Sequence, residues 1–440
     1  MQRDLARVLK LSDLLVIVIG TVIGSGIFLV PGNVLNSAHG DVGVALLIWA
    51  LGGVLSLLGA LSFGELGAME PEAGGIYVYL RQAYGPLVAF LYGWAMFFVI
   101  GSGSIATLSV AFGTRYLPQL VNLGPVAGKV AALVVIATVA AVNVRGTRQG
   151  AAVQNWSTAI KVGALLLMSI ALLARGSAWG PEVRFLDTPL DATLLTGAGV
   201  GMIGVLWAYE GWQYVTFSAG EAVNPQRTFP RGIVLGTALV IGVYLLANVA
   251  YVVALGPAGV GGSKRVAADA LSALFGMGWG TVISIPILIS ILGAANGLTL
   301  TTPRVFYAMA RDGLFFRKLG DVHPRFGTPA VAIIAGSAWA AVLAISGTFE
   351  QLYTYVVFSS WIFFVLGAAA LFVYRRRRPD APRPFRTPGY PVTPALFILA
   401  ALAVVVNTLA ANPTQGGIEL LILGTGVPAY FIWRRRSDAP

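Results

Sequence analysis

The chain has 440 residues, of which 57% are hydrophobic and 11% are charged, and its net charge is +11. Because a soluble globular domain carries about 25% charged residues, this composition indicates a polytopic membrane protein without a large soluble domain. There is no cysteine, and the only histidines are His39 and His323, which excludes a disulfide, a thiolate nucleophile and the usual metal clusters. We expect the positive charge in basic cytoplasmic loops rather than at a nucleic acid interface.

Twelve apolar stretches are long enough to cross a bilayer core of about 30 Å. The predicted spans cover residues 12–36, 42–69, 85–117, 126–143, 153–174, 194–219, 232–255, 278–309, 330–347, 352–374, 391–411 and 417–433. Residues 1–440 are therefore expected to form a single transmembrane domain. The first apolar run is too long for the core of a signal peptide, so we interpret it as a retained helix.

The distribution of Lys and Arg predicts the orientation of the chain. With the N-terminus in the cytoplasm, the inner segments hold 22 of the 29 Lys and Arg residues and the outer loops hold six. This imbalance favours twelve spans in the inner (cytoplasmic) membrane with both termini in the cytoplasm. The basic, proline-rich segment 375–391 is expected to be a cytoplasmic loop that sets spans 11 and 12 (391–433) apart from the first ten.

The first span contains a weak point at mid-membrane. Its sequence over residues 14–35, LLVIVIGTVIGSGIFLVPGNVL, has no charge, and Gly24, Ser25 and Gly26 lie in its middle. Glycine weakens a helix, and a break at this depth leaves N–H and C=O groups that lipid cannot satisfy. Such a break would face a protein-lined cavity or a ligand. Alternatively, Gly20 and Gly24 form a GxxxG pattern that only allows close helix packing.

A second weak point lies in span 6, where Glu210 is followed by Gly211 within WAYEGWQ. An acidic residue at membrane depth must face the bundle interior or water. Spans 1 and 6 each open a block of five spans, 12–174 and 194–374, and the two blocks have opposite orientations. Interrupted segments at corresponding positions in two halves are typical of secondary transporters with inverted repeats.

The two breaks together predict a site for a zwitterion. The second half of span 1 begins near Gly26 and Ile27, and its free N–H groups and positive dipole end suit a carboxylate. The first halves of spans 1 and 6 end at residues 22–23 and 207–208, and their free carbonyls suit an ammonium group. This pairing matches an α-amino acid. The aromatic residues Trp207, Tyr209 and Trp212 either wall and gate the site or simply pack.

Two ionisable side chains raise the question of coupling. Lys161 lies about ten residues, or roughly 15 Å, into span 5, near the bilayer centre. A lysine there could replace a cation such as sodium, exchange a proton, or only tie helices together. Glu210 could bind a cationic part of a substrate, carry a proton, or bond to neighbouring helix groups. Glu221, at the cytoplasmic end of span 6, is expected to pair with a loop arginine.

Several motifs resemble the amino acid–polyamine–organocation (APC) superfamily and, within it, the L-type amino acid transporter group and its bacterial relatives. They are GTVIGSGIF (20–28), FGELGAMEPEAGGIYVYLRQAYGP (63–86), WAYEGWQ (207–213), GEAVNPQRTFPRG (220–232) and NGLTLTTPRVFYAMARDG (296–313). Lys161 falls where the group has a helix 5 lysine. The resemblance covers essentially the whole chain. It implies an all-α, LeuT-type fold with twelve transmembrane helices, five-helix inverted repeats, broken helices 1 and 6, and alternating access.

The resemblance also implies roles for single residues. Ser25 and Gly26, with Val22, would contact the substrate carboxylate and backbone, and Trp207 would be an aromatic gate. The backbone carbonyls of Ala208 and Glu210 would receive the α-amino group. Lys161 would bridge helices 1 and 8 in place of sodium, which implies sodium-independent transport. Many L-type members have a small residue at the position of Glu210. Eukaryotic members pair with a single-span glycoprotein through a cysteine, and a chain without cysteine cannot form that bond.

We therefore expect a secondary active transporter of amino acids, with neutral ones foremost, that works by sodium-independent exchange or proton coupling. The alternative is a cationic amino acid or polyamine antiporter with Glu210 as counter-charge. An intramembrane enzyme or an ATP-driven pump is disfavoured because HExxH and GxxxxGK[ST] motifs, and paired membrane carboxylates beyond Glu210, are missing. A channel would not need two opposed broken helices, and no metal or cofactor is expected. The predicted site residues are Val22, Ile23, Gly24, Ser25, Gly26, Ile27, Trp207, Ala208, Tyr209, Glu210 and Gly211, with Trp207, Lys161 and Glu210 in gating or coupling.

Overall fold

The computed structural model describes residues 8–180, 183–411 and 413–437, and these form helices joined by turns and loops. The helices of the first half of the chain are α1 (Leu11–Val22), α2 (Gly26–Leu29), α3 (Pro31–Ser37), α4 (Val42–Met69), α5 (Ile76–Tyr84), α6 (Pro86–Ala95), η1 (Met96–Ile100), α7 (Gly101–Ala111), η2 (Phe112–Tyr116), η3 (Leu117–Gln119), α8 (Pro125–Val144) and α9 (Thr147–Arg175). Those of the second half are α10 (Ala192–Tyr209), η4 (Trp212–Glu221), α11 (Pro225–Gly262), α12 (Val266–Phe275), α13 (Met277–Thr301), α14 (Pro303–Arg311), η5 (Arg317–Gly320), α15 (Ala330–Ser346), α16 (Phe349–Arg377), α17 (Val392–Ala411) and α18 (Pro413–Ser437). The predicted all-α class is confirmed.

Eleven helical stretches among the described residues are long and apolar enough to cross a membrane, and each overlaps one predicted span. The remaining prediction, 330–347, coincides with α15, which is apolar but has only 17 residues. At 1.5 Å per residue α15 is about 25 Å long, at the short end of lengths that cross a bilayer. The structure thus supports a multi-pass membrane protein, with eleven long spans and one short helix where twelve spans were predicted.

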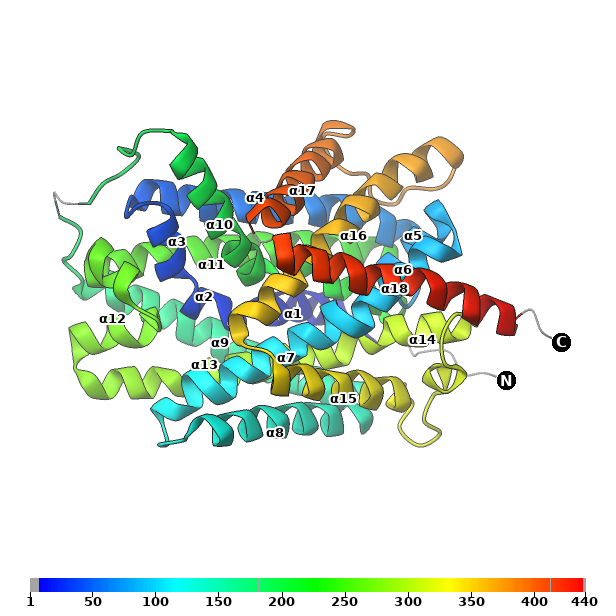
Figure 1. Cartoon of the computed structure of the whole chain (residues 1–440), viewed down its shortest axis with the longest axis horizontal. Coiled ribbons are helices and arrows are strands. Elements are labelled where there is room, and N and C mark those ends of the chain that lie inside the picture. The colour runs from blue at the N-terminus through cyan, green and yellow to red at the C-terminus, as the bar shows by residue number, and fades with distance from the viewer. Residues whose placement is uncertain (1–7, 181–182, 412, 438–440) are drawn as a thin grey trace.

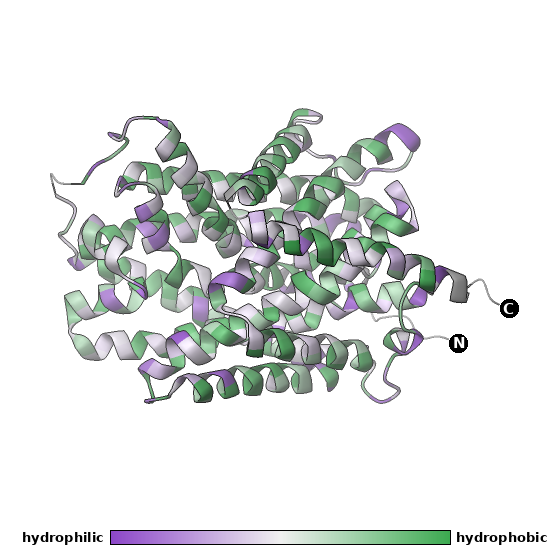
Figure 2. Ribbon diagram, viewed as in Figure 1, coloured by the Kyte–Doolittle hydropathy of each residue, from purple (hydrophilic) through white to green (hydrophobic). Residues whose placement is uncertain are grey.

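The long helices run roughly along the horizontal axis of Figure 1, and α1 lies near the middle of the assembly. It packs against α9, α11, α13 and η4, while α10 packs against α3, α4, α16 and α17. Hydrophobic residues dominate the helices, and hydrophilic ones gather at helix ends and loops (Figure 2). The first and last described residues lie at the same end of the molecule (Figure 1). This arrangement surrounds the broken first span with protein on several sides.

Spans 1 and 6 are both broken, as predicted. In span 1, α1 ends at Val22 and α2 begins at Gly26, and the intervening Ile23 is extended. In span 6, α10 ends at Tyr209, Glu210 is extended, and Gly211 has φ +138°, a value that strongly favours glycine. Beyond the break the chain continues as η4, a ten-residue 3₁₀-helix, which is unusually long for that tighter geometry.

The two breaks pack directly against each other. A Cβ atom on Gly26 would lie 2.5 Å from the Cα of Ala208, and one on Gly211 would lie 2.7 Å from the backbone nitrogen of Val22. Both distances are far below van der Waals contact. Glycine at these two positions therefore lets the broken ends of spans 1 and 6 approach each other closely enough to form one site.

Candidate substrate site

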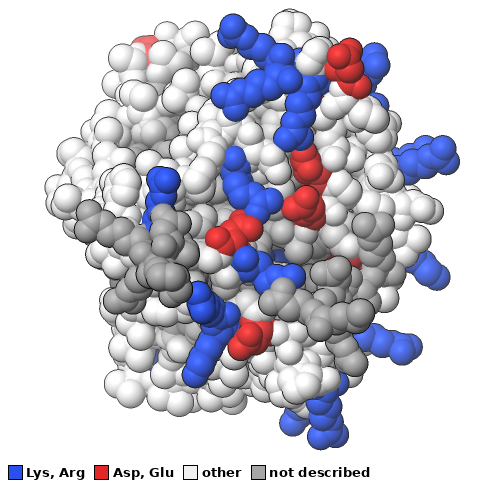
Figure 3. Space-filling model, turned by 90° about the vertical axis from the view of Figure 1, so that its right-hand side faces the viewer, with Lys and Arg blue, Asp and Glu red and all other residues white. Residues whose placement is uncertain are grey.

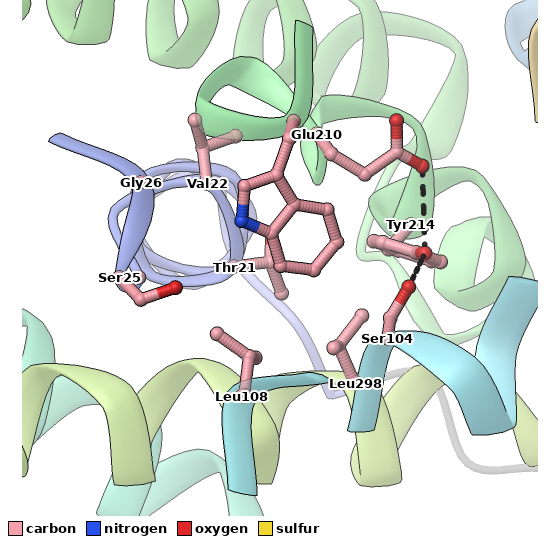
Figure 4. A pocket seen from close by; sticks show the side chains of 11 residues that line it. Thr21, Val22, Ser25, Gly26, Ser104, Leu108, Glu210, Tyr214 and Leu298 are labelled. Carbon is pink, nitrogen blue, oxygen red and sulfur yellow. Dashed lines mark hydrogen bonds between the residues drawn. The ribbon is translucent and has the colours of Figure 1, made fainter. Parts of the chain in front are cut away.

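A cavity of about 280 Å³ lies between the two breaks, and helices α7 and α13 close its remaining sides. Figure 4 shows Ser25 and Leu108 on one side of it and Glu210 and Tyr214 on the other. The lining residues are Thr21, Val22, Gly24, Ser25, Gly26, Ser104, Leu108, Trp207, Glu210, Tyr214 and Leu298. The wall is thus mixed, with hydroxyl groups and one carboxyl group facing apolar side chains.

The break in span 1 presents unpaired donors. None of the described residues accepts a hydrogen bond from the backbone N–H groups of Ser25, Gly26 and Ile27. The Ser25 hydroxyl is buried, lines the cavity, and also has no partner in the described part of the chain. Buried polar groups in proteins are nearly always hydrogen-bonded. An anionic group in the cavity would satisfy these donors.

The carbonyl groups at the broken ends are partly occupied. The Tyr244 hydroxyl lies 3.1 Å from the Val22 carbonyl oxygen and 3.0 Å from that of Ala208. Because one hydroxyl has a single hydrogen, it donates fully to only one of these carbonyls at a time. The Ile23 carbonyl accepts from Lys161 and from the Ser290 hydroxyl. Of the predicted acceptors for an ammonium group, Ile23 is therefore the most heavily used within the protein.

Lys161 reaches from α9 to the end of α1. Its ammonium nitrogen lies 2.8 Å from the Gly20 carbonyl oxygen, 2.7 Å from that of Ile23 and 2.9 Å from that of Ser290 on α13. The three protons of the ammonium group are thus matched by three acceptors. The last carbonyls of a helix are its negative dipole end, so a cation there is favourable. Lys161 does not line the cavity, and its three hydrogen bonds hold the broken end of α1 against α13.

Glu210 is anchored by one oxygen only. Its Oε1 accepts from Gln213 Nε2 at 2.5 Å, from the Ser360 hydroxyl at 3.2 Å and from the Tyr214 hydroxyl at 3.5 Å. The Tyr214 hydroxyl also lies 3.1 Å from Ser104 Oγ on α7 (Figure 4). None of the described residues donates a hydrogen bond to Oε2 of Glu210. The side chain therefore bonds to neighbouring helices and still offers an acceptor at the cavity wall.

Aromatic side chains separate this cavity from a second one. Trp207 stacks on Tyr353 with ring centroids 6.0 Å apart, and it meets Phe349 edge-on. Tyr353 and Phe349 also line a wider cavity of about 570 Å³, together with charged residues that include Arg115 and Glu350. Trp207 and its two partners are thus placed as a partition between the two cavities.

A buried ion pair lies at the end of η4. Glu221, at the end of η4, pairs with Arg304 on α14 at 2.9 Å, and their side chains are only 3% and 2% exposed. The Glu221 carbonyl also accepts from the N–H groups of Val8 and Leu9, just before α1. The expectation that Glu221 pairs with an arginine is confirmed. The partner, however, lies on helix α14 within span 8 and not in a loop as expected.

Comparison with known proteins identifies the family. The profile of a family described as amino acid permease matches residues 9–427. The chain belongs to this amino acid permease family. The permease is 33% identical to the serine/threonine exchanger of Bacillus subtilis (strain 168), and the match covers 96% of each chain. It is also 33% identical to the human cystine/glutamate transporter, over 95% of this chain and 83% of the relative. Its identity to the human b(0,+)-type amino acid transporter 1 is 33%, over 98% and 88%.

The family and these relatives are transporters, so the permease is an amino acid transporter and not an enzyme. The expected membership of the APC superfamily is confirmed by the same matches. These comparisons do not separate one class of amino acid substrate from another, because the relatives' names include serine/threonine, cystine/glutamate and b(0,+)-type transporters. The roles of single residues stay predictions.

About half of the predicted site residues line the cavity. Those that do are Val22, Gly24, Ser25, Gly26, Trp207 and Glu210, and those that do not are Ile23, Ile27, Ala208, Tyr209, Gly211 and Lys161. The second group forms the breaks themselves or supports them. Sequence analysis missed the lining residues Thr21, Ser104, Leu108, Tyr214 and Leu298. Of these residues, only Tyr214 could have been predicted from the sequence, because it lies about one helical turn beyond Glu210.

The expectation of a single deep carboxyl group is wrong. Glu419 on α18 is also buried within a span, and it accepts a hydrogen bond from the Ser359 hydroxyl at 2.8 Å. Ser359 is adjacent to Ser360, which bonds to Glu210. Glu210 and Glu419 thus bond to neighbouring serines of α16, and Glu65 on α4 and Glu221 at the end of η4 are further buried carboxyl groups in membrane-spanning stretches. The described residues contain no group of three or more His, Cys, Asp or Glu placed to hold a metal ion.

Proposed function

We propose that the permease carries neutral α-amino acids across the cytoplasmic membrane by sodium-independent exchange or proton coupling. The observation that carries the proposal is the Lys161 ammonium group, which lies between the end of α1 and α13 with three carbonyl partners at 2.7–2.9 Å. It occupies the kind of oxygen cage that would suit a cation. A sodium ion a few ångströms from it would be repelled, since like charges at that distance disfavour each other strongly.

The substrate carboxylate meets the N–H groups of Ser25, Gly26 and Ile27 and the Ser25 hydroxyl. Supporting this pose, these donors have no partner among the described residues, and they lie at the first turn of a helix segment. The α-amino group turns toward the broken end of span 6 near Ala208 and Glu210. The side chain then points toward Ser104, Leu108 and Leu298, whose mixed character suits a small neutral amino acid.

Alternating access uses two inverted five-span repeats, 12–174 and 194–374, whose first spans are the broken ones. Supporting this, the breaks in α1–α2 and α10–η4 meet at one cavity. Trp207 gates one side, and the Glu221–Arg304 pair closes the other. Because the two breaks are in direct contact, substrate binding would affect the conformation of both at once.

Both termini lie in the cytoplasm. The first and last described residues are at the same end of the molecule, and that face carries many Lys and Arg side chains (Figure 3). Cytoplasmic loops carry an excess of these residues. The predicted cytoplasmic location of residues 1–7 and 438–440 concerns parts of the chain outside the described residues. The permease works without a disulfide-linked subunit, because it has no cysteine.

A second candidate is transport of cationic amino acids or polyamines. The observation that favours it is the Oε2 atom of Glu210, which receives no hydrogen bond from the described residues although Glu210 lines the cavity. An ionised carboxylate there would pair with a substrate ammonium group. Against it, the other oxygen accepts three hydrogen bonds, which fits a carboxyl group that positions η4 and α16.

The test is uptake of a radiolabelled amino acid panel into proteoliposomes of the purified protein. We expect neutral amino acids to enter at the same rate when sodium is replaced by choline. We also expect faster uptake when the vesicles hold internal amino acid or when the outside is acidified. A requirement for sodium would overturn the proposal.

Glu210→Gln separates the two candidates. If the substrate is neutral, the amide keeps most hydrogen bonds of the carboxyl group, and the panel's order of preference stays the same. If the substrate is cationic, uptake of arginine or putrescine is lost because their counter-charge is removed. Inhibition of the native protein by putrescine but not by neutral amino acids would establish the second candidate.

A further inference from the structure

A further concave feature, distinct from the two cavities beside Trp207, lies on an outer face of the molecule that membrane-spanning helices form. It is a groove of about 810 Å³ between α9, α12 and α13, which pack against one another. Its lining residues are all apolar: Ala164, Leu167, Met168, Ala171, Leu271, Phe275, Trp279, Val282, Ile283 and Pro286. A groove with this lining does not suit a zwitterionic amino acid.

The groove opens outward from membrane-spanning segments. Leu167 on α9 is 71% exposed, and Trp279 and Val282 on α13 are 50% and 53% exposed. Both helices belong to stretches long and apolar enough to cross a membrane. In a multi-pass membrane protein such residues face hydrocarbon, so the molecule that can fill the groove is the acyl chain of a lipid.

One end of the groove carries a positive charge. Arg175, the last residue of α9, places its guanidinium carbon 5.0 Å from the centre of the Phe275 ring, and Phe275 lines the groove. Arg175 is exposed, and no acidic partner for it occurs within residues 8–180, 183–411 and 413–437. Trp279, 5.8 Å from Phe275, adds an amphipathic ring of the type enriched at membrane interfaces.

We propose that this groove is a binding site for one anionic phospholipid of the leaflet on the Arg175 side. The acyl chain lies between α9, α12 and α13, and the headgroup phosphate pairs with Arg175. Basic residues at helix ends attract anionic headgroups, and the apolar groove fixes the chain that hangs below. The site is separate from the proposed transport function and does not depend on it.

The position of the groove links the lipid to the substrate site. Ala164 lies three residues from Lys161 on α9, and Pro286 lies four residues from Ser290 on α13. Lys161 and Ser290 both bond to the Ile23 carbonyl at the break of span 1. A bound lipid therefore supports the helix pair that holds the break, and it should raise the thermal stability of the protein by mass action.

The experiment is native mass spectrometry of the detergent-solubilised protein, titrated with phosphatidylglycerol or phosphatidylcholine. We expect one tightly held phosphatidylglycerol, with a rise in the melting temperature, and weaker binding of phosphatidylcholine. Arg175→Gln should weaken phosphatidylglycerol binding by about fivefold, the effect of one basic residue at an anionic lipid surface. Arg148→Gln, near the other end of α9, is the matched control and should leave binding unchanged.

A second pair of variants tests the groove itself. Ala171→Trp fills it and should abolish the adduct, whereas Val130→Trp, at an exposed position on α8, should not. Leu167→Trp, at the exposed rim, gives the same test if Ala171→Trp lowers the yield of folded protein. Equal affinity for phosphatidylglycerol and phosphatidylcholine would overturn the proposed preference for an anionic headgroup. A phosphatidylglycerol adduct that survives in both Ala171→Trp and Leu167→Trp would overturn the proposed site.

Discussion

At the level of single residues, Lys161 is the side chain whose removal should have the largest effect. Its ammonium group serves three carbonyls at the break of span 1 and on α13. Lys161→Ala removes this donor from all three carbonyls, although that of Ile23 keeps the Ser290 hydroxyl, and each buried acceptor left unsatisfied costs about 1–3 kcal/mol. We predict that the variant reaches the membrane but that radiolabelled amino acid uptake into proteoliposomes is abolished.

Lys129→Ala is the matched control for Lys161→Ala. Lys129 also donates to two carbonyls, those of Ala344 and Gly347, but at the end of α15 and away from the substrate cavity. Its variant should keep most of the uptake. Full activity in Lys161→Ala would show that the lysine has no role in transport.

Asp41 provides a prediction about pH outside the spans. It precedes α4, and its carboxylate accepts hydrogen bonds from the backbone N–H groups of Val44, Leu186, Asp187 and Thr188 at 2.9–3.0 Å. Burial raises the pKa of Asp41, but hydrogen bonds from the Leu186, Val44 and Thr188 backbones outweigh it and lower the pKa from 3.8 to about 2. The ionised form therefore stabilises the folded state above pH 3.8, and this stabilisation is lost as the pH falls toward 2.

We predict that Asp41→Ala lowers the free energy of unfolding at pH 7 by about 1–2 kcal/mol, as expected when a helix N-cap is lost. The readout is the melting temperature in detergent, followed by tryptophan fluorescence between pH 7 and pH 2. The native protein should lose stability between pH 4 and pH 2 more steeply than the variant. Asp380→Ala, an exposed position after α16, should behave like the native protein. Parallel acid profiles for native protein and Asp41→Ala would contradict the prediction.

At the level of elements, the break in span 6 depends on the backbone of Gly211. This residue combines φ +138° with a close approach to the backbone of Val22. Gly211→Ala adds strain of about 1–3 kcal/mol and a clash that pushes spans 1 and 6 apart. We predict at least a tenfold loss of amino acid uptake, measured as initial rate per amount of reconstituted protein.

Gly163→Ala on α9 is the control for Gly211→Ala, because nothing lies within 4 Å of its added Cβ atom. It should keep native uptake and slightly favour the helix, since alanine is the better helix former. If both glycine variants transport equally well, the close contact between the breaks is not needed.

The breaks could be predicted from the sequence, whereas most of the cavity could not. Glycines and a glutamate within apolar stretches are local sequence signals, and they correctly predicted the breaks in spans 1 and 6. Ser104, Leu108 and Leu298 lie in regular helical segments, and an almost uniformly apolar span does not indicate which of its faces meets a cavity. Glu419 was overlooked because its burial depends on packing against α16 rather than on its own span.

At the level of the whole molecule, the number and order of the long helices follow from hydropathy, but their lengths do not all follow. α15 is shorter than a typical span, and α11 continues to Gly262, seven residues beyond its predicted end. Within α11, Gly256 has φ +68° next to Pro257, so the helix bends there and runs on past the apolar stretch. Hydropathy reports where a chain is apolar, whereas tertiary packing decides where each helix stops.

At the level of the whole molecule, the proposed closure of one end by the buried pair of Glu221 and Arg304 can be tested. Removing one partner of a buried ion pair costs about 3–5 kcal/mol because the other charge is left buried alone. Glu221→Gln should therefore open the end of the molecule at which η4 and α14 meet. Because the protein has no cysteine, Ser25→Cys introduces a single thiol at the cavity as a reporter. We predict that Glu221→Gln raises the labelling rate of this thiol by a membrane-impermeant reagent at least tenfold, from the cytoplasmic side only.

Glu72→Gln in the same Ser25→Cys background is the control for this labelling experiment. Glu72 pairs with Arg81 at 3.5 Å on the surface, with its side chain 54% exposed, and such pairs contribute little to stability. Its labelling rate should match that of the parent. Right-side-out and inside-out vesicles separate the two faces. Faster labelling from both faces would mean that the ion pair stabilises the whole fold rather than one gate. Unchanged labelling would mean that the ion pair is not needed, because the hydrogen bonds from the Val8 and Leu9 backbones to Glu221 keep that end closed.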